Sequence, residues 1–404
     1  MTVVHPIARA WISTGGTGAR NYDEFADDAE ITEIIAANPQ SALAIEMPHR
    51  APDSLGKSFT AALPEAVARL ARQKAAGSYA AAEDVVVLYR IDEPGRPDEA
   101  GYGIFAMVDT DEISTSADEP GLVIRNEDVF IEKVRERVAL AEATGHLLSP
   151  VLLLQTGRGT ELHAAILDAI AAAGAPAVTD VDHVGRTHAI WTIAADAAAG
   201  LLALAGGGDL VVADGNHRSL AAQTGGLGRF LAVITTPGSV AIQPYHRLLT
   251  ELPVPLGELL DRLRAAGSGV DRLAGTAGIP DQGIVHLYGP GGGYRVELPT
   301  PSTPVDAIVD GMDHALVERL LLRDGLGLEP GDKRITYVGG DYSPQWLVGE
   351  VDAGRAELAI LIAPVTVDEF VAVNLARQKM PRKSTWFIPK ARGGLVLADL
   401  AAEG

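Results

Sequence analysis

The sequence contains no cysteine, and this absence excludes several kinds of chemistry. Without thiols the chain has no disulfide framework, no thiolate zinc site and no cysteine nucleophile. Aromatic residues make up only 5% of the chain, and no apolar run reaches membrane-spanning length without charges or glycines. The first ten residues also lack the long apolar stretch of a secretory signal. We therefore expect a cytoplasmic protein with no membrane partner.

Positive charge is scarce as well, with 33 Lys and Arg against 53 Asp and Glu and a net charge of −20. A chain this acidic does not bind nucleic acid through its bulk charge, which leaves only a local basic patch for such a role. The length of 404 residues and the 47% of hydrophobic residues suffice for a large core and suggest two domains or one elaborate one. The segment P-V-P at 253–255 predicts a boundary between a motif-bearing domain at 1–252 and a smaller C-terminal α/β domain at 253–404.

Helical and strand patterns alternate along the chain, but several strands follow one another with no helix between them. This order predicts an α+β fold with a mixed sheet rather than a doubly wound parallel sheet. The expected strands are 85–90, 102–108, 151–155, 188–193, 210–213, 230–235, 242–249, 283–288, 294–297, 335–338 and 358–362. The expected helices are 60–76, 129–144, 161–173, 195–205, 256–266, 312–324, 349–354 and 367–377. The glycine runs at 206–208 and 289–293 predict a helix end and a hairpin turn, since neither has the Lys and Ser/Thr of a phosphate loop.

The most informative stretch is L-V-V-A-D-G-N-H-R-S-L-A-A at residues 210–222. It predicts a buried strand, a tight turn at Gly215 and a helix that opens on polar residues. His217 and Arg218 would lie in the first helical turn, where backbone N–H groups and the helix dipole attract anions. Asp214 suits Mg²⁺ or a substrate hydroxyl, because magnesium prefers carboxylates together with phosphate oxygens. The plainer reading is a strand–turn–helix corner with Asp214 as its N-cap. Two basic residues directly after the turn favour a phosphate site instead.

The same turn carries a family resemblance. A-D-G-N-H-R resembles the A-D-G-H-H-R signature of a prokaryotic family known as a domain of unknown function. That family is distantly similar to the ParB/sulfiredoxin superfamily, in which free serine kinases have a D-G-H-H-R-type turn. The long segment M-P-R-K-S-T-W-F-I-P-K at 380–390 resembles the family's M-P-x-K-S-T-x-F-x-P-K. Further matches are N-Y-D-E-F at 21–25, I-R-N-E at 124–127 with Lys133 and Arg137, H-A-I-W at 188–191, and Y-H-R at 245–247.

The resemblance implies a ParB/sulfiredoxin-like core in the first half, but two residues depart from the family pattern. Asn126 and Asn216 stand where the family usually has histidine. An amide hydrogen-bonds a phosphate or a hydroxyl but does not carry a proton near neutral pH. Altered substrate choice or lost activity is therefore one expectation. The absence of cysteine excludes sulfiredoxin chemistry, and the acidic charge counts against the DNA-binding role of the ParB relatives.

The resemblance brings further residues into the candidate site. Glu127 would be a general base for a hydroxyl nucleophile, although from sequence alone a glutamate that merely suits the helix dipole is the commoner case. Lys133 and Arg137, four residues apart, share a helix face that would meet either phosphate or solvent. His246 and Arg247 repeat the His–Arg pairing beside a strand, where a lone histidine is usually a core or edge residue. A constrained C-terminal loop of cations and hydroxyls would form a phosphate clamp, and it contains Lys383, Ser384, Thr385 and Lys390. The alternative is that its lysines are ordinary surface residues.

The candidate site has one acidic turn, several positive groups and no obvious covalent nucleophile. This combination favours phosphoryl transfer, in which the protein mainly positions the reactants and neutralises charge. The catalytic candidates are Asp214, His217 and Glu127, with Asp214 also as the metal ligand. The phosphate- or nucleotide-binding candidates are Gly215, Asn216, Arg218, Lys133, Arg137, His246, Arg247, Lys383, Ser384, Thr385 and Lys390.

By resemblance to the free serine kinases, the leading hypothesis is a phosphotransferase acting on a small hydroxylated metabolite. Serine or phosphoserine is the first candidate, with Mg²⁺ and a nucleotide or pyrophosphate as the phosphate partner. The alternatives are a phosphoserine phosphatase, a nucleotide-dependent binding or switch protein, and a catalytically reduced scaffold.

Overall fold

The computed structural model describes residues 2–403 except for 23, 26, 115–120, 128, 130, 276 and 300–307. Backbone contacts divide the chain into unit 1, Met1–Val240 with Pro389–Gly404, and unit 2, Ala241–Ile388. The expected division into 1–252 and 253–404 stays a prediction. It has one boundary, whereas the compact units meet at two places in the sequence, at 240/241 and at 388/389. The end of the chain belongs to unit 1 because strand β20 (Val396–Asp399) pairs antiparallel with strand β2 (Ile7–Ser13).

Unit 1 is built on a mixed sheet of 12 strands in the described residues. Nine of them follow the order β5-β10-β7-β11-β4-β3-β2-β20-β6, while β1 pairs with β4, β9 with β3, and β8 with β9. Two pairings are parallel, β5 with β10 and β7 with β11, and the others are antiparallel. The remaining strands are β1 (Val4–His5), β3 (Tyr79–Glu93), β4 (Arg96–Asp109), β5 (Val123–Ile124), β6 (His146–Leu147), β7 (Val151–Gln155), β8 (Val178–Val181), β9 (Thr187–Ala194), β10 (Leu210–Asp214) and β11 (Arg229–Thr235). The predicted mixed α+β fold is confirmed.

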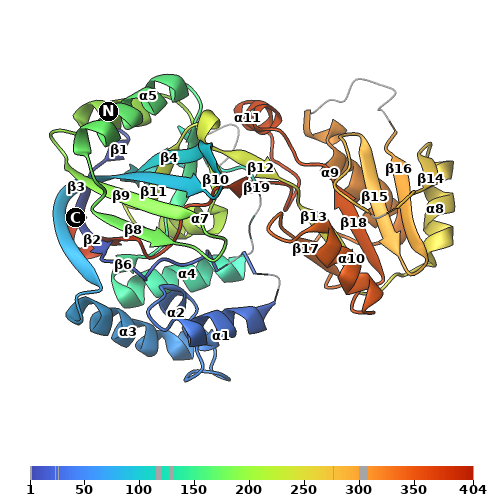
Figure 1. The fold of residues 1–404 in the computed structure, drawn as a ribbon, viewed down its shortest axis with the longest axis horizontal. Coiled ribbons are helices and arrows are strands. Elements are labelled where there is room, and N and C mark those ends of the chain that lie inside the picture. The colour runs from blue at the N-terminus through green and yellow to red at the C-terminus, as the bar shows by residue number, and fades with distance from the viewer. Residues whose placement is uncertain are drawn as a thin grey trace. The chain divides into compact units, whose positions relative to one another are not determined.

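The helices of unit 1 lie on both sides of this sheet, with α3 and α4 on one side and α5 on the other (Figure 1). The main core joins sheet residues such as Val212 and Ala232 to Leu162 and Ile166 of α5. A second cluster joins Leu70 of α3, Leu140 of α4 and Leu397 of β20. The helices are α1 (Asp28–Ala37), α2 (Leu43–Glu46), α3 (Leu63–Ala75), α4 (Ile131–Thr144), α5 (Gly159–Ala173), α6 (Ala199–Ala205) and α7 (Asn216–Thr224), with short 3₁₀ turns η1 (Pro48–Arg50), η2 (Thr60–Ala62), η3 (Thr110–Glu112), η4 (Pro237–Ser239) and η7 (Leu400–Ala402).

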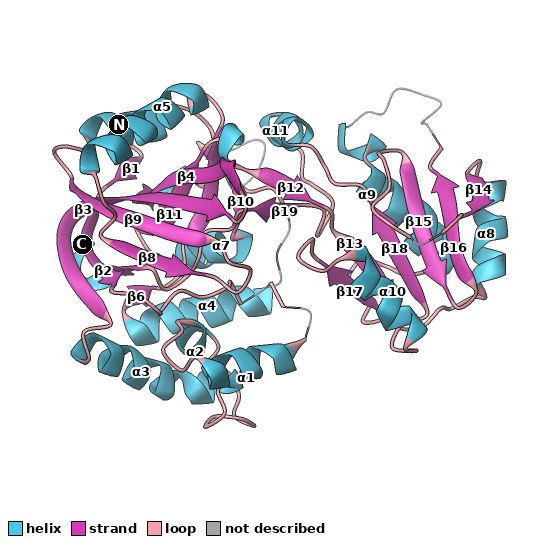
Figure 2. Ribbon diagram, in the orientation of Figure 1, coloured by secondary structure: helices cyan, strands magenta, loops and turns pink. Residues whose placement is uncertain are grey.

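Unit 2 is smaller and contains an antiparallel sheet in the order β14-β16-β15-β18-β13-β17. Residues of the central strand alternate between two cores, as the strand period of two requires: Ile360 faces α8 and η6, while Leu361 faces α10. Figure 2 shows the strands and helices of unit 2 by colour. The elements are β12 (Ala241–Gln243), β13 (His246–Leu249), β14 (Gly269–Arg272), β15 (Ile284–Gly289), β16 (Gly292–Glu297), β17 (Ile335–Val338), β18 (Leu358–Ile362), β19 (Trp386–Ile388), α8 (Leu256–Ala265), η5 (Ile308–Gly311), α9 (Asp313–Leu316), the π-helix η6 (Val317–Gly325), α10 (Pro344–Asp352) and α11 (Val367–Leu375).

One expected strand, 242–249, is wrong. The segment forms two strands in different sheets, β12 paired with β19 and β13 paired with β17 and β18. Pro244 lies between them, and a proline lacks the N–H group that a continuous ladder needs. The hairpin expected at 289–293 is confirmed, since Gly289 pairs with Gly292. No helix in the described residues is long and apolar enough to cross a membrane.

Candidate functional site

The turn between β10 and α7 places Asp214 at the start of a helix. The register of β10 against β7 shifts between Val212 and Asp214, and a bulge of this kind redirects the side chain that follows it. Gly215 then has φ +94°, a left-handed conformation that residues with side chains rarely adopt. Helix α7 therefore begins directly beside the Asp214 carboxylate, with its first-turn N–H groups lacking intrahelical acceptors.

The carboxylate of Asp214 lies between two cations. Lys390 Nζ is 2.8 Å from Oδ1, and Arg218 Nη2 is 2.5 Å from Oδ2. The three side chains are only 8–15% exposed. Charge-assisted hydrogen bonds are stronger than neutral ones, and screening by water is reduced at such burial. The turn is therefore a compact charged cluster with two cations to one carboxylate.

Asn21 connects this cluster to both ends of the chain. Its side chain is 1% exposed, and its Nδ2 lies 2.8 Å from Glu24 Oε1 and 3.3 Å from Asp214 Oδ2. Its Oδ1 accepts a hydrogen bond from Arg218 at 3.0 Å, and Nδ2 also approaches the Ala391 carbonyl. Residues from the beginning, middle and end of the sequence thus meet at one point of unit 1.

The first turn of α7 is buried rather than solvated. Asn216 and His217 are 5% and 4% exposed. Asn216 Nδ2 donates to Asn126 Oδ1 at 2.5 Å, and the Asn126 backbone N–H donates to Asn216 Oδ1 at 3.3 Å. The two positions at which the sequence departs from the family pattern therefore contact each other. This pairing occupies the Asn216 amide that the sequence assigned to ligand binding.

The candidates on and before α4 have different environments. Glu127 is half-buried and directly follows the asparagine that pairs with α7, whereas Lys133 is exposed. Arg137, one turn further, is buried. Its guanidinium donates to the Glu46 carbonyl at 3.1 Å and lies 4.1 Å from the centre of the Tyr22 ring. Arg137 therefore packs within unit 1 and does not share one solvent-facing surface with Lys133.

The second His–Arg pair belongs to the interior of unit 2. Arg247 is fully buried, and its guanidinium lies 3.0 Å from Glu318 Oε1 and 3.0 Å from the Lys383 carbonyl. His246 Nδ1 accepts the backbone N–H of Ile362 at 3.1 Å. Burial, together with the neighbouring guanidinium, lowers the pKa of His246 to about 4.

The K-S-T segment also lies in unit 2. Lys383 has φ +54°, and its ammonium is 5.5 Å from the centre of the Tyr245 ring. Ser384 is 1% exposed, and Thr385 is half-buried. Lys390, by contrast, belongs to unit 1 and contacts Asp214. The expectation that Lys383, Ser384 and Thr385 close over the Asp214 turn stays a prediction.

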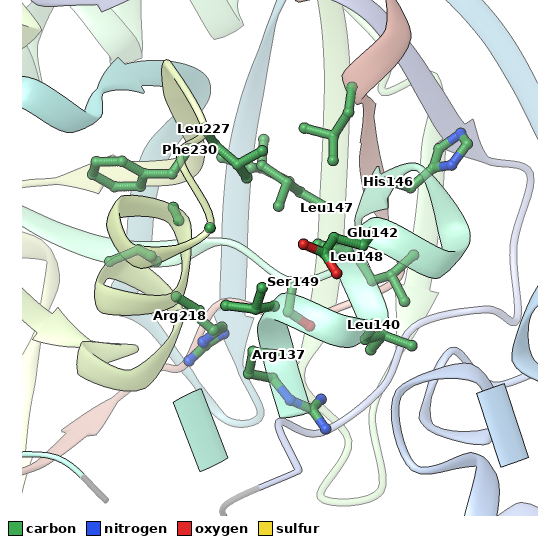
Figure 3. Close-up of a pocket in the computed structure, with 18 of the residues that line it drawn as sticks. Arg137, Leu140, Glu142, His146, Leu147, Leu148, Ser149, Arg218, Leu227 and Phe230 are labelled. Carbon is green, nitrogen blue, oxygen red and sulfur yellow. The ribbon is translucent and has the colours of Figure 1, made fainter. Parts of the chain in front are cut away.

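A cavity of about 90 Å³ lies beside Arg218, lined by residues of α4 and α7 (Figure 3). Its wall is mostly apolar and includes Leu140, Leu227 and Phe230. Arg137 and Arg218 lie at one end in Figure 3. An apolar cavity of this kind suits a small apolar group rather than phosphate. Polar groups also line it away from Arg218, among them Glu142 and His146 (Figure 3).

The residues around Asp214 do not form a ready magnesium site. Both carboxylate oxygens accept hydrogen bonds from cations. Among the described residues, no group of three or more His, Asp or Glu side chains is placed to hold a metal ion. Because Mg²⁺ is usually held by one or two carboxylates plus phosphate oxygens, binding here would need Asp214 to release a cation.

A model for a protein family of unknown function, DUF1015, matches residues 17–315. The chain belongs to this family. The membership predicted from the turn and the K-S-T motif is confirmed. The DUF1015 match includes Asn21, Asp214 and Arg218 and ends before Lys390. No curated protein matches the chain.

Solved structures give distant likenesses to this DUF1015 protein. A conserved hypothetical protein from Pyrococcus furiosus is 13% identical, with a TM-score of 0.38 over 71% of this chain and 93% of that one. A free serine kinase in complex with AMP is 11% identical, with a TM-score of 0.40 over 74% and 93%. C-terminally truncated SbnI from Staphylococcus aureus is 12% identical, with a TM-score of 0.41 over 74% and 88%. At such scores, the ligands of those proteins do not bear on this site.

Sequence reasoning missed two residues of the DUF1015 site, Asn21 and Glu24. The signal was present in the N-Y-D-E-F match at 21–25, but an asparagine outside a helix or strand pattern carries no chemistry by itself. Its role follows only from the fold, which brings residue 21 to Asp214. Asp23, in the same segment, lies outside the described residues.

Proposed function

We propose that the turn at Asp214 binds the phosphate of a small molecule and transfers a phosphoryl group to or from a hydroxylated metabolite, with serine and phosphoserine as first candidates. The observation that carries this proposal is the pair of cations, Arg218 and Lys390, held against one carboxylate at the beginning of α7. A helix N-terminus with adjacent Arg and Lys is a favourable setting for phosphate.

In this proposal the chain supplies position and charge rather than a covalent intermediate. The acceptor hydroxyl oxygen forms a bond to phosphorus while the bond to the leaving oxygen of the nucleotide or pyrophosphate breaks. Arg218 and Lys390 stabilise charge on the phosphoryl oxygens, and Asp214 orients both cations. The hydroxyl proton passes to a carboxylate.

Two carboxylates are candidates for that proton. Glu127 is the sequence-based choice, and the asparagine before it contacts α7. Glu24 is buried and shares the amide of Asn21 with Asp214. Glu127→Gln and Glu24→Gln separate them, since loss of the base should lower the rate of phosphoryl transfer while leaving nucleotide affinity nearly unchanged.

The phosphate partner in the proposal is a nucleotide or pyrophosphate, with Mg²⁺ as an optional companion. Asp214 would hold Mg²⁺ only after releasing Arg218 or Lys390, and the metal would then supply further positive charge to the phosphate. His217, Gly215, Lys133 and the K-S-T residues stay in the proposal as sequence-based candidates. Lys383→Ala should weaken binding of a phosphorylated ligand and leave the neutral acceptor little affected.

The test is product formation followed by ³¹P NMR. The protein is incubated with serine and ATP, ADP or pyrophosphate, and separately with phosphoserine and AMP, each with and without Mg²⁺. We expect phosphoserine formation or consumption, lost in Lys390→Ala and retained in the surface control Arg229→Ala, whose side chain is 34% exposed. No turnover and no binding of any phosphate compound would remove the proposal.

A second candidate is phosphate or nucleotide binding without turnover. The observation that favours it is the Asn126–Asn216 pair, because two amides satisfy each other where an imidazole would carry a proton. The same experiment separates the two functions. Ligand stabilisation in a thermal shift without product in the NMR spectrum would favour the binding protein.

A further inference from the structure

Lys390 reaches Asp214 on the segment 389–394, which several groups of unit 1 hold in place. Ala19 and Gly393 exchange backbone hydrogen bonds of 3.0 and 3.1 Å. The Gly394 carbonyl accepts from Thr17 Oγ1 and from the hydroxyl of Tyr79. These bonds fix the far end of the segment, three to four residues beyond Lys390.

The near end of the segment depends on a buried tyrosine. The backbone N–H of Arg392 donates to Tyr89 Oη at 3.3 Å, and Arg392 Nη2 donates to the Gly18 carbonyl at 3.0 Å. Tyr89 is 1% exposed, and its hydroxyl lies 2.6 Å from Nδ1 of His188. The hydroxyl therefore connects the segment that carries Lys390 to the strand β9.

This connection continues to a carboxylate. His188 Nε2 lies 3.3 Å from Asp182 Oδ2, and the Arg186 backbone N–H donates to Asp182 Oδ1 at 2.8 Å. Because Nε2 faces a carboxylate, it carries the ring proton, and Nδ1 accepts from the tyrosine hydroxyl. Every hydrogen bond in the series Arg392–Tyr89–His188–Asp182 then has one donor and one acceptor.

The protonation states keep this direction fixed near neutral pH. Burial lowers the pKa of His188, so the ring stays neutral. Burial also raises the pKa of Tyr89, so the hydroxyl keeps the proton that it donates. For Asp182 burial acts upward, but hydrogen bonds from His188 and the Arg186 backbone bring its pKa down to about 2.

We propose that Tyr89, His188 and Asp182 are positioning residues that hold Lys390 against Asp214 through the backbone of Arg392. Their importance for catalysis rests on the proposed function, whereas the effect on Lys390 does not. In the absence of the tyrosine hydroxyl, the Arg392 N–H loses its acceptor two residues from the ion pair. The 389–392 portion then keeps the long 3.4 Å contact between Asn21 and the Ala391 carbonyl and the bond from the Arg392 side chain to Gly18, so its backbone is held less firmly, while Gly393 and Gly394 stay bound.

The test measures the rate at which acetic anhydride acetylates Lys390, followed by peptide mass spectrometry, because the ion pair protects this ammonium. Lys57, which is 40% exposed, is the internal reference. Loss of one hydrogen bond in Tyr89→Phe should raise Lys390 acetylation about fivefold relative to Lys57. Tyr79→Phe is the matched control, since this equally buried hydroxyl binds Gly394 at the far end. It should leave Lys390 close to the wild-type rate.

A conservative exchange separates positioning from folding. His188→Leu removes both ring nitrogens and should expose Lys390 as Tyr89→Phe does. His188→Asn keeps a side-chain oxygen near the Nδ1 position and should restore most of the protection. If Tyr89→Phe and His188→Leu also accelerate Lys57, the fold has loosened, and the Asn variant decides: protected Lys390 supports the proposal, exposed Lys390 overturns it.

Wild-type protection in folded Tyr89→Phe, or equal acceleration in Tyr79→Phe, overturns the positioning role. The readout needs no ligand, so it is independent of the proposed function. A wild-type protein that protects Lys390 but binds neither pyrophosphate nor AMP would disprove the proposed function alone.

Discussion

The chain contains three His–Arg dipeptides, and two of them, His217–Arg218 in unit 1 and His246–Arg247 in unit 2, are used differently. In unit 1, Arg218 extends from the first turn of α7 to the carboxylate of Asp214, the amide oxygen of Asn21 and the main-chain carbonyl of Pro150, which is 2.6 Å away. In unit 2, Arg247 is the second residue of β13 and donates to Glu318 and to the main-chain carbonyls of residues 245–246 and 382–383.

The partners of each guanidinium indicate its role. Main-chain carbonyls exist whatever the side chains are, so an arginine that caps several of them fixes the path of the backbone. Side-chain partners are chosen residue by residue and can exchange for a ligand of similar charge. Arg218 combines the Asp214 and Asn21 side chains with one carbonyl, that of Pro150, whereas Arg247 donates to one side chain and to the carbonyls of residues 245, 246, 382 and 383. We therefore expect Arg218 to exchange partners for a ligand more readily than Arg247, although the dipeptides are identical.

The largest expected effect is the loss of stability in Arg247→Ala. Removing one partner of a buried pair leaves Glu318 and the carbonyls of the 382–383 turn without compensation, at a cost of about 3–5 kcal/mol. Urea unfolding together with hydrogen exchange across residues 241–388 measures it. An Arg247→Ala variant as stable as wild type would erase the distinction between the two pairs.

The next effect is a loss of stability in acid through the histidine of the same pair. The pKa of His246 is about 4 in the folded chain against an ordinary value of 6.5. Between these values the unfolded state binds a proton that the folded state does not, so stability falls as the pH falls, by up to about 3 kcal/mol. The difference between the unfolding free energies at pH 7 and pH 5 should be smaller in His246→Asn, which keeps an acceptor but does not titrate. The remaining difference comes from other buried histidines, such as His188 and His314, whose pKa burial also lowers. An unchanged pH dependence in this variant would contradict the assignment.

Much of the fold follows from local pattern. The apolar run at 210–213 and Gly215 predict β10 and the turn, and the glycines at 289–293 predict a hairpin. The error at 242–249 has a local cause too, since Pro244 divides an otherwise suitable strand. The pairing of β20 with β2, which returns the end of the chain to unit 1, depends on contacts nearly 400 residues apart and has no local signal.

The sequence predicted the charged residues of the site that lie in recognisable turn or loop motifs. It did not predict the neutral residues that hydrogen-bond to those charges. Asp214, Arg218 and Lys390 carry their chemistry in their side chains, and they do meet. Arg137 has the same charge as Arg218 but packs against Tyr22, a difference that helix periodicity does not reveal. Asn21 and Tyr89 matter through hydrogen bonds that only the folded chain creates.

A third prediction concerns the amide pair beside the unit 1 turn. Asn216→Ala leaves the buried Asn126 amide without its partner, and Asn126→Ala does the reverse, so each should cost about 1–3 kcal/mol. The double variant should cost less than the sum, because the second exchange removes an already unpaired group. Additive costs, measured by urea unfolding, would show that the two amides do not interact.

A fourth prediction concerns Gly215. Alanine there must adopt a left-handed φ, which costs about 1–2 kcal/mol, and its Cβ would lie 2.9 Å from Arg218 Nε. Gly215→Ala should therefore lose both stability and pyrophosphate affinity. Gly226→Ala is the matched control, since its φ is +69° and nothing lies within 4 Å of its Cβ. It should lose stability alone, and equal loss of affinity in both variants would remove the link between the turn and Arg218.

A large effect on binding with a smaller effect on stability is expected in Arg218→Ala. Lys390 stays against Asp214 and continues to neutralise it, but the Asn21 oxygen and the Pro150 carbonyl lose a donor, so the free energy of unfolding should fall by about 1–3 kcal/mol, less than in Arg247→Ala. Pyrophosphate affinity, measured by calorimetry, should fall more than about tenfold, because a hydrogen bond to a charged group contributes roughly 1.5–3 kcal/mol. Arg218→Lys should recover part of it, since lysine keeps the charge but not the planar fork. If Arg218→Ala instead unfolds the chain as Arg247→Ala is expected to, both His–Arg pairs are structural, and the phosphate site must lie elsewhere.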